Sequence, residues 1–292
     1  MEYHLEPNEG KQVVTGGTVS LAVRSRMNCF VACLKSSICM SSGYNKYTKE
    51  CELYDEVSSE ISAQGWTVTT TVKYGESESL PGLTCSDIQQ RRSSEMLPSG
   101  VYWVTLGEPG AFQVYCDMDT DGGGWTLVWT YKFTNYASFA TSSNAVTPRP
   151  SWDVSPFTAS SSPISTTPPL TEQDLGALEF AKWKQIGSEF MVKSNINQWI
   201  ACTPNIGSLV DWATGSLTCR MVKVIASGHC TTAVPTRLSF WNFGPSLDKT
   251  SAFYYFDTYN LNNYPTHDPC GTNSGNKYLT GIPNPRGNIF IR

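Results

Sequence analysis

Residues 85–132 read CSDIQQRRSSEMLPSGVYWVTLGEPGAFQVYCDMDTDGGGWTLVWTYK. Three runs in this stretch, at 101–106, 112–115 and 125–131, are rich in β-forming residues and are separated by Gly, Pro and Asp clusters, which is typical of an antiparallel meander. The glycines at 122–124 permit a tight turn into the third run, and no G-K-[ST] follows them, which excludes a P-loop. We therefore expect a β-rich unit that begins near residue 85.

An alternating acidic run precedes these glycines at Asp117, Asp119 and Asp121. Three carboxylates at this spacing resemble the start of an EF-hand calcium loop, which also needs glycine at its sixth position and glutamate at its twelfth. Those positions hold Gly122 and Val128, so the second requirement fails. We interpret the run as the connection of a hairpin.

The ten cysteines occur in three groups, which are Cys29, Cys33, Cys39 and Cys51, then Cys85 and Cys116, and then Cys202, Cys219, Cys230 and Cys270. An even count in separate groups indicates disulfides, and hence an oxidising, extracellular compartment. The alternative is a zinc site. It is disfavoured because the sequence holds no C-x2-C pair and no histidine pair at ligand spacing.

Composition narrows the classes of function. The 292 residues suffice for two domains, and 16% charged with 12% aromatic residues suits an extracellular β-rich protein. A net charge of −4 means that the chain has no excess of basic residues to indicate nucleic-acid binding. No apolar run approaches the ~20 residues of a membrane span. The opening MEYHLEPNEG lacks the features of a secretory signal, so we expect a secreted chain to have lost it already.

The first 74 residues resemble a PAN/apple domain. The similarity lies in the helical run NCFVAC at 28–33, the strand SSGYN after Cys39, and the C-x-L at 51–53. It implies a small disulfide-stapled module of one sheet and one helix, with Cys29 bonded to Cys51 and Cys33 bonded to Cys39. It also implies binding of proteins or carbohydrates. The polar stretch GESESLPGLT at 75–84 is predicted to be a linker.

The next part resembles a fibrinogen-like domain, through CSDI at 85–88, SGVY at 99–102, CDM at 116–118 and DGGGWT at 121–126. The resemblance implies a mixed β-sheet domain with long loops over 85–292 and a disulfide between Cys85 and Cys116. Together the two modules give an α+β fold class. Within the second, residues 134–170 are predicted to be a long surface insertion with little regular structure, and the alternative is an O-glycosylated or binding loop. A helix is predicted to start at Thr171.

The fibrinogen-like similarity thins toward the end. The segment HDPCGTNSGNKY at 267–278 is similar to a family segment, but the D-x-D-N-C calcium loop is missing. The cysteine spacing also departs from the common pattern, so we expect Cys202 to bond Cys219 and Cys230 to bond Cys270. This part is closer to the intelectin branch, in which Asn, Glu and His residues hold a glycan-binding calcium.

A candidate ligand site follows from the run NLNNYPTHD at 260–268, which combines amides, an imidazole, a carboxylate and an aromatic ring. Such a mixture suits a sugar, although Asn, Pro and Asp are also what any solvated loop uses. The predicted ligand-binding residues are Asn262, Asn263, His267, Asp268, Asn273 and Tyr278, and the predicted calcium carboxylates are Asp257 and Asp268. Of the aromatic residues at 241–259, most are expected in the core and one or two at a ligand surface.

Catalysis is not expected. His4, His229 and His267 stand apart, and the chain has no H-E-x-x-H, no G-x-S-x-G and no nucleotide-binding glycine fingerprint. The resemblances imply a secreted, non-enzymatic, lectin-like binder of surface glycans, with a role in innate immunity, Ca²⁺ as its candidate cofactor and avidity from a homo-oligomer. The alternative is an adhesive matrix protein that assembles through protein–protein contacts.

Overall fold

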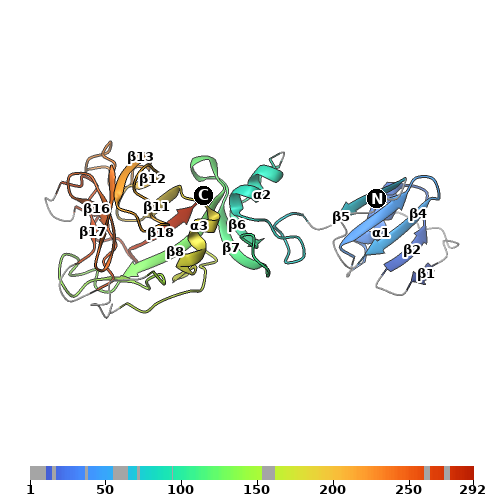
Figure 1. Cartoon of the computed structure of the whole chain (residues 1–292), viewed down its shortest axis with the longest axis horizontal. Coiled ribbons are helices and arrows are strands. Elements are labelled where there is room, and N and C mark those ends of the chain that lie inside the picture. Colours follow the sequence, from blue (N-terminus) through green and yellow to red (C-terminus); the bar gives the residue numbers. More distant parts are fainter. Residues whose placement is uncertain are drawn as a thin grey trace. The chain divides into compact units, whose positions relative to one another are not determined.

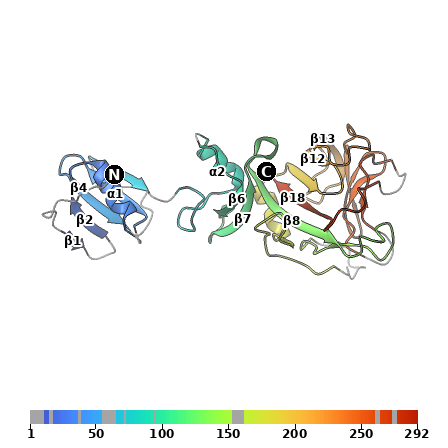
Figure 2. The same ribbon diagram turned by 180° about the vertical axis from the view of Figure 1, so that it is seen from behind.

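The computed structural model describes residues 11–14, 18–36, 39–54, 65–70, 73–93, 95–152, 162–259, 264–272 and 277–292. The chain forms two compact units, residues 1–81 and 82–292 (Figures 1 and 2), and the boundary lies inside the segment predicted to be a linker. Most of the described structure is β-sheet, with few helices. No helix in these ranges is both long and apolar enough to cross a bilayer.

The first unit is a five-stranded antiparallel sheet with one helix packed on it. Its elements are β1 (Lys11–Val14), β2 (Thr18–Ala22), α1 (Arg26–Leu34), β3 (Ser41–Asn45), β4 (Glu50–Tyr54) and β5 (Trp66–Thr70), and the strand order is β1-β2-β4-β3-β5. Helix α1 begins after Ser25, whose hydroxyl oxygen accepts the N–H of Asn28 at 3.2 Å. The helix contacts β3 and β4 at the middle of the sheet (Figure 1).

The core of this unit is small and contains its own cross-links. Its buried members are Val23, Cys29, Ala32, Cys33, Tyr44, Cys51 and Leu53. Cys29 bonds Cys51 and Cys33 bonds Cys39, with the partners that the PAN resemblance implies. Two covalent links supplement a core of this size, which buries little apolar surface by itself.

The second unit is built on one long antiparallel sheet of thirteen strands. Its strands are β6 (Gly100–Val104), β7 (Phe112–Asp117), β8 (Trp125–Phe133), β9 (Val146–Thr147), β10 (Gly176–Ala177), β11 (Phe190–Ser194), β12 (Trp199–Pro204), β13 (Gly215–Lys223), β14 (Arg237–Trp241), β15 (Gly244–Asp248), β16 (Ala252–Tyr255), β17 (Thr266–His267) and β18 (Arg286–Ile291). The main path runs β17-β16-β15-β14-β13-β12-β11-β18-β8-β7-β6. Strand β18, the last in sequence, thus lies between β11 and β8, beside the long β8 in both views (Figures 1 and 2).

The helices of this unit are short and lie outside that path. They are α2 (Cys85–Arg91), η1 (Thr120–Gly122), η2 (Phe180–Lys182) and α3 (Trp183–Ile186). Three disulfides join Cys85 to Cys116, Cys202 to Cys219 and Cys230 to Cys270, again with the expected partners. The Cys202–Cys219 bond links directly opposed residues of β12 and β13.

The predicted hairpin connection between β7 and β8 is confirmed, because the two strands pair antiparallel across it. The carboxylate of Asp117 accepts the N–H groups of Asp119 and Thr120 at 3.1 and 2.9 Å and pairs with Lys193 at 2.5 Å. Gly123 has φ +74°, and a Cβ there would overlap the carbonyl oxygen of Met118. The acidic run therefore shapes a turn instead of an EF-hand loop.

Ion pairs fasten this turn to the rest of the sheet. The guanidinium of Arg220, on β13, pairs with Asp121 and also with Glu189, the latter at 2.7 Å. Arg292 pairs with Glu189 at 2.8 Å, and its guanidinium lies 4.1 Å from the ring centroid of Trp125. The turn is thus held in place by two arginines that are distant from it in sequence.

The helix predicted from Thr171 is wrong. The Thr171 hydroxyl oxygen accepts the N–H groups of Gln173 and Asp174, each at 3.2 Å, which closes a turn. Such local side-chain bonds compete with helix formation. The chain continues as the short β10, and helical structure begins only at η2.

The segment 134–170 is more than a surface insertion. Within its described parts, the side chains of Phe139 and Trp152 are buried at 1% and 2% exposure. The Trp152 ring meets that of Trp129 edge-on at 5.1 Å, and the Phe139 ring packs against that of Phe133 at 4.7 Å. The segment therefore supplies large aromatic side chains to the core.

Candidate functional site

His267 lies in the aromatic core, not at the surface where the sequence analysis expected it. Its side chain is fully buried, and its ring centroid lies 4.8 Å from that of Tyr254 and 5.0 Å from that of Phe133. The Tyr131 hydroxyl and His267 Nε2 are hydrogen-bonded at 3.1 Å. Burial lowers the pKa of His267 to about 3, so the ring is neutral near pH 7.

Asp268 is also buried, at 1% exposure, and its carboxylate is engaged by the backbone. It accepts the N–H groups of Cys270 at 2.9 Å and Thr272 at 3.3 Å. These bonds shape the turn that carries the Cys230–Cys270 disulfide. The carboxylate thus has a structural task at the position where a sugar contact was predicted.

Asp257 is fully buried, and its Oδ1 accepts the N–H of Tyr259 at 2.9 Å. Burial raises the pKa of this carboxyl to about 7. The N–H of Asp268 donates to the carbonyl oxygen of Phe253 in β16 at 3.0 Å, whereas Asp257 lies beyond the end of that strand. The described part of the chain holds no group of three or more His, Cys, Asp or Glu side chains placed for a metal.

Of the other predicted ligand residues, only Tyr278 is among the described residues. Tyr278 is half-buried, with its ring 4.2 Å from that of Phe139 and 5.7 Å from that of Tyr136. Asn262, Asn263 and Asn273 lie outside the described residues. The cluster expected at 257–278 is thus, where it is described, a packed end of the core.

An open groove lies instead on one face of β14, β15 and β16. Ser239 is opposite Ser246, and Ser246 is in turn opposite Tyr255, so these three residues share a face. The groove has a volume of about 640 Å³. We call it the β14–β16 groove; its lining residues are Arg237, Trp241, Ser246, Asp248, Lys249, Thr250, Ser251, Ala252 and Tyr255.

Trp241 supplies the apolar surface of this groove, and Asp248 supplies a fixed acceptor. The Trp241 side chain is 62% exposed, although aromatic residues of this size are mostly buried. The Asp248 carboxylate accepts hydrogen bonds from the hydroxyls of Ser239 at 2.7 Å and Ser246 at 2.5 Å, which orient it. An exposed indole beside oriented polar groups can stack on a sugar ring and bond its hydroxyls.

Sequence reasoning placed Trp241 in an aromatic-rich stretch without selecting it. The alternation in RLSFW does put Arg237, Ser239 and Trp241 on one face. The alternation does not show which of the two faces of β14 is buried under the rest of the second unit and which is exposed. Tyr254 and Phe256 occur in the same stretch, yet both are fully or nearly fully buried.

Protein-family models match part of each of the two units. A family model for the PAN domain matches residues 6–79. A model for the C-terminal globular domain of fibrinogen beta and gamma chains matches residues 82–139. The second match includes the turn between β7 and β8 and ends well before the β14–β16 groove.

Several known proteins are similar in sequence to part of this chain. The human fibrinogen alpha chain is 34% identical over 94 residues, which are 30% of this chain and 10% of the relative. Fibrinogen-like protein A of Apostichopus parvimensis is 34% identical over 70 residues, 20% of this chain and 25% of the relative. Mouse Tenascin-N is 41% identical over 75 residues, 25% of this chain and 5% of the relative. The chain thus spans a quarter or less of each of these proteins.

Among solved structures, the fibrinogen-like globe domain of human ANGPTL6 aligns with 76% of this chain and 98% of its own, with a TM-score of 0.34 and 14% identity. The chain carries a segment similar to PAN domains, followed by a segment similar to the fibrinogen C-terminal globular domain.

Proposed function

We propose that this chain is a non-enzymatic extracellular recognition protein that binds surface glycans through the β14–β16 groove. The observation that carries the proposal is Trp241, an indole that is 62% exposed at a groove lined with hydroxyl, carboxylate and cationic side chains. A sugar offers an apolar ring face to the indole and hydroxyls to the polar groups.

The compartment and the modules support recognition outside the cell. All ten cysteines are paired in five disulfides, which persist in oxidising surroundings. Both matched segments belong to families that include recognition modules, which suits a lectin with a role in innate immunity. A single open groove binds a sugar weakly, so the proposal includes avidity from a homo-oligomer.

A glycan array tests the proposal directly. The intact protein is expected to bind a subset of glycans, and Trp241→Ala is expected to lose that binding. Tyr47→Ala is the matched control, because Tyr47 is an aromatic side chain of similar exposure, 65%, in the other unit. Absence of any bound sugar, or full binding by Trp241→Ala, would contradict the assignment.

The same array, repeated with EDTA, tests calcium dependence. Calcium remains a candidate cofactor, although Asp257 and Asp268 are both buried and the Asp268 carboxylate already accepts two backbone N–H groups. We therefore expect binding in the β14–β16 groove to survive EDTA. Loss of binding in EDTA would show that the glycan site depends on a bound cation.

A second candidate function is adhesion through protein–protein contacts. Met27 and Leu34 lie seven residues apart on α1, hence on one helix face, and are 61% and 57% exposed. Exposed apolar side chains on one face favour a protein partner. Light scattering separates the candidates, since large assemblies that sugar does not affect would favour adhesion, and a small oligomer that binds sugar would favour the lectin.

A further inference from the structure

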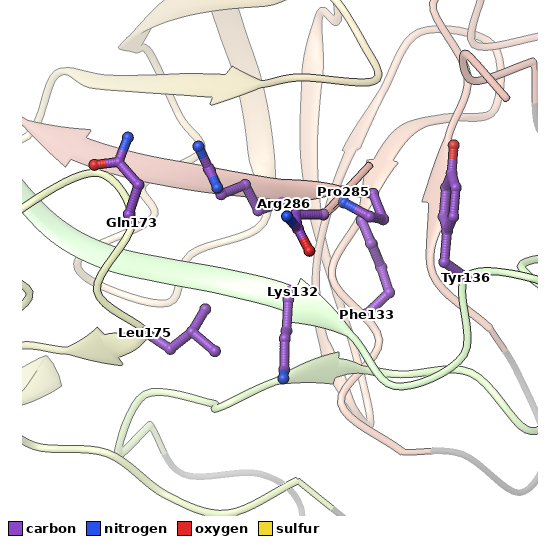
Figure 3. A pocket seen from close by; sticks show the side chains of 8 residues that line it. Lys132, Phe133, Tyr136, Gln173, Leu175, Pro285 and Arg286 are labelled. Atoms are coloured by element: carbon purple, nitrogen blue, oxygen red, sulfur yellow. The ribbon is translucent and has the colours of Figure 1, made fainter. Parts of the chain in front are cut away.

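A second cavity lies where β8 ends and β18 begins, apart from the residues of the β14–β16 groove. It has a volume of about 350 Å³, within the range of small-molecule sites. Its lining includes Lys132, Phe133, Tyr136, Gln173, Asn284 and Arg286. Figure 3 shows Lys132 and Arg286 extending from the two neighbouring strands in different directions, with Gln173 and Leu175 on a loop beside them.

Two cations line this cavity from neighbouring strands. Arg286 of β18 is the direct cross-strand partner of Lys132 of β8, and their side chains extend in different directions (Figure 3). No lining residue of the cavity is acidic, and within the described ranges neither cation forms an ion pair. The lining therefore carries positive charge that an anionic ligand would balance.

The wall that carries Arg286 is held in a fixed geometry. The Asn195 side chain donates from Nδ2 to the carbonyl oxygen of Asn284 at 3.1 Å, and its Oδ1 accepts the N–H of Arg286 at 2.9 Å. On another side, the Tyr136 hydroxyl donates to the carbonyl oxygen of Leu279 at 2.5 Å. The cavity is thus preformed, which lowers the cost of ordering on binding.

The remaining lining groups suit a sugar that bears a carboxylate. The guanidinium fork of Arg286 matches the two oxygens of a carboxylate, whereas Lys132 adds a point charge. Gln173 and Asn284 present amides that can both donate to and accept from hydroxyls, and Tyr136 adds aromatic surface. We propose that this cavity is a second binding site, specific for carboxylate-bearing sugars.

The test measures binding of glucuronate, glucose and inorganic sulfate to the full chain by isothermal titration or ligand-detected NMR. We expect glucuronate to bind and glucose to bind at least about tenfold more weakly, because it lacks the charge. The double variant Lys132→Gln/Arg286→Gln should weaken glucuronate binding about tenfold or more. Binding should also weaken in high salt, which screens charges at a partly exposed site.

Lys184→Gln is the control, because it removes one exposed positive charge of the same unit outside the cavity lining. It should leave glucuronate affinity unchanged. Unaltered binding in the double variant would overturn the site, and sulfate binding as tight as that of glucuronate would reduce it to a general anion site. The double variant should unfold at about the same temperature as the parent, which would show that the loss of binding is not a loss of folding. Trp241→Ala should retain glucuronate binding, so this site and the β14–β16 groove can fail separately.

Discussion

Two tryptophans in one sheet have opposite environments. Trp125, at the turn between β7 and β8, is fully buried, and the Arg292 guanidinium lies over its ring. Trp241, at the β14–β16 groove, is 62% exposed. The neighbouring carboxylates differ in the same way, because Asp117 pairs with a buried lysine and Asp248 is hydrogen-bonded by two serine hydroxyls.

The contrast separates residues that hold the fold from residues that face a partner. At the turn, Asp117 and Asp121 each pair with a cation and the backbone conformation of Gly123 favours glycine, so few sequences fit. The family match covers this turn and not the groove. Substitutions should therefore lower stability at the turn and leave it nearly unchanged at the groove.

Gly123→Ala should produce the largest loss. A Cβ at this position would overlap the Met118 carbonyl, and the residue has φ +74°. We expect a loss of about 4 kcal/mol in the free energy of unfolding, measured by denaturant titration. Gly107→Ala is the control, because Gly107 has φ +79° with nothing within 4 Å of its Cβ. Its expected loss is about 1 kcal/mol, and equal losses would show that φ alone restricts the turn.

Lys193→Met should give the second-largest loss in the free energy of unfolding. Burial disfavours ionisation of Asp117, but hydrogen bonds from Lys193 and Thr120 hold the pKa of its carboxyl below the usual value. Removal of the lysine leaves a buried carboxylate with no counter-charge, at a cost of about 3 kcal/mol. Lys223→Met is the control: Lys223 also lies over Trp199, but it is exposed. A loss of stability smaller than that of Lys223→Met would mean that the buried pair of Lys193 and Asp117 does not stabilise the fold.

Asp257→Asn should change the dependence of stability on pH. The folded chain holds the Asp257 proton up to its pKa of about 7, whereas the unfolded chain releases it near 3.8. This contribution to stability is therefore fully present below pH 3.8 and is lost as the pH rises toward 7. Relative to the parent, the variant should gain about 2 kcal/mol between pH 5 and 7. The difference between the two proteins cancels the opposite slope of the buried His267, and a flat difference would place the Asp257 carboxyl in contact with water.

Trp241→Ala should have the smallest effect on stability, within about 0.5 kcal/mol, because its side chain is mostly exposed. Trp125→Ala should cost about 3 kcal/mol or more, because it empties a buried site. Thermal and chemical unfolding of the two variants give this comparison. A loss above about 2 kcal/mol at Trp241 would make the indole part of the fold and remove the basis of the glycan site.

Much of the architecture was predictable from sequence motifs. The turn after Asp117 followed from its acidic and glycine residues, whereas the partners of the first six cysteines followed from the resemblance to PAN and fibrinogen-like domains. The helix predicted at Thr171 is absent because the Thr171 hydroxyl oxygen accepts a hydrogen bond from a nearby backbone N–H group and closes a turn. The residue types that suit a helix start suit such a turn equally well.

The candidate site was much less predictable. His267 and Asp268 have side chains that suit a sugar, but composition does not reveal exposure, and both proved to be buried. Conversely, alternation along β14 assigns Trp241 to a face without showing that nothing covers it. The cavity between Lys132 and Arg286 depends on the pairing of strands that are far apart in sequence, which no local pattern records.

The central position of β18 also has a kinetic consequence. During synthesis, β8 and β11 emerge long before Arg286–Ile291, and until then each exposes an unpaired edge to other chains. Pairing over such a sequence separation is slow, so the nascent unit passes through a state prone to aggregation. A chaperone that shields those edges, or a secretory pathway that retains chains lacking β18, would act during the interval before β18 pairs with β8 and β11.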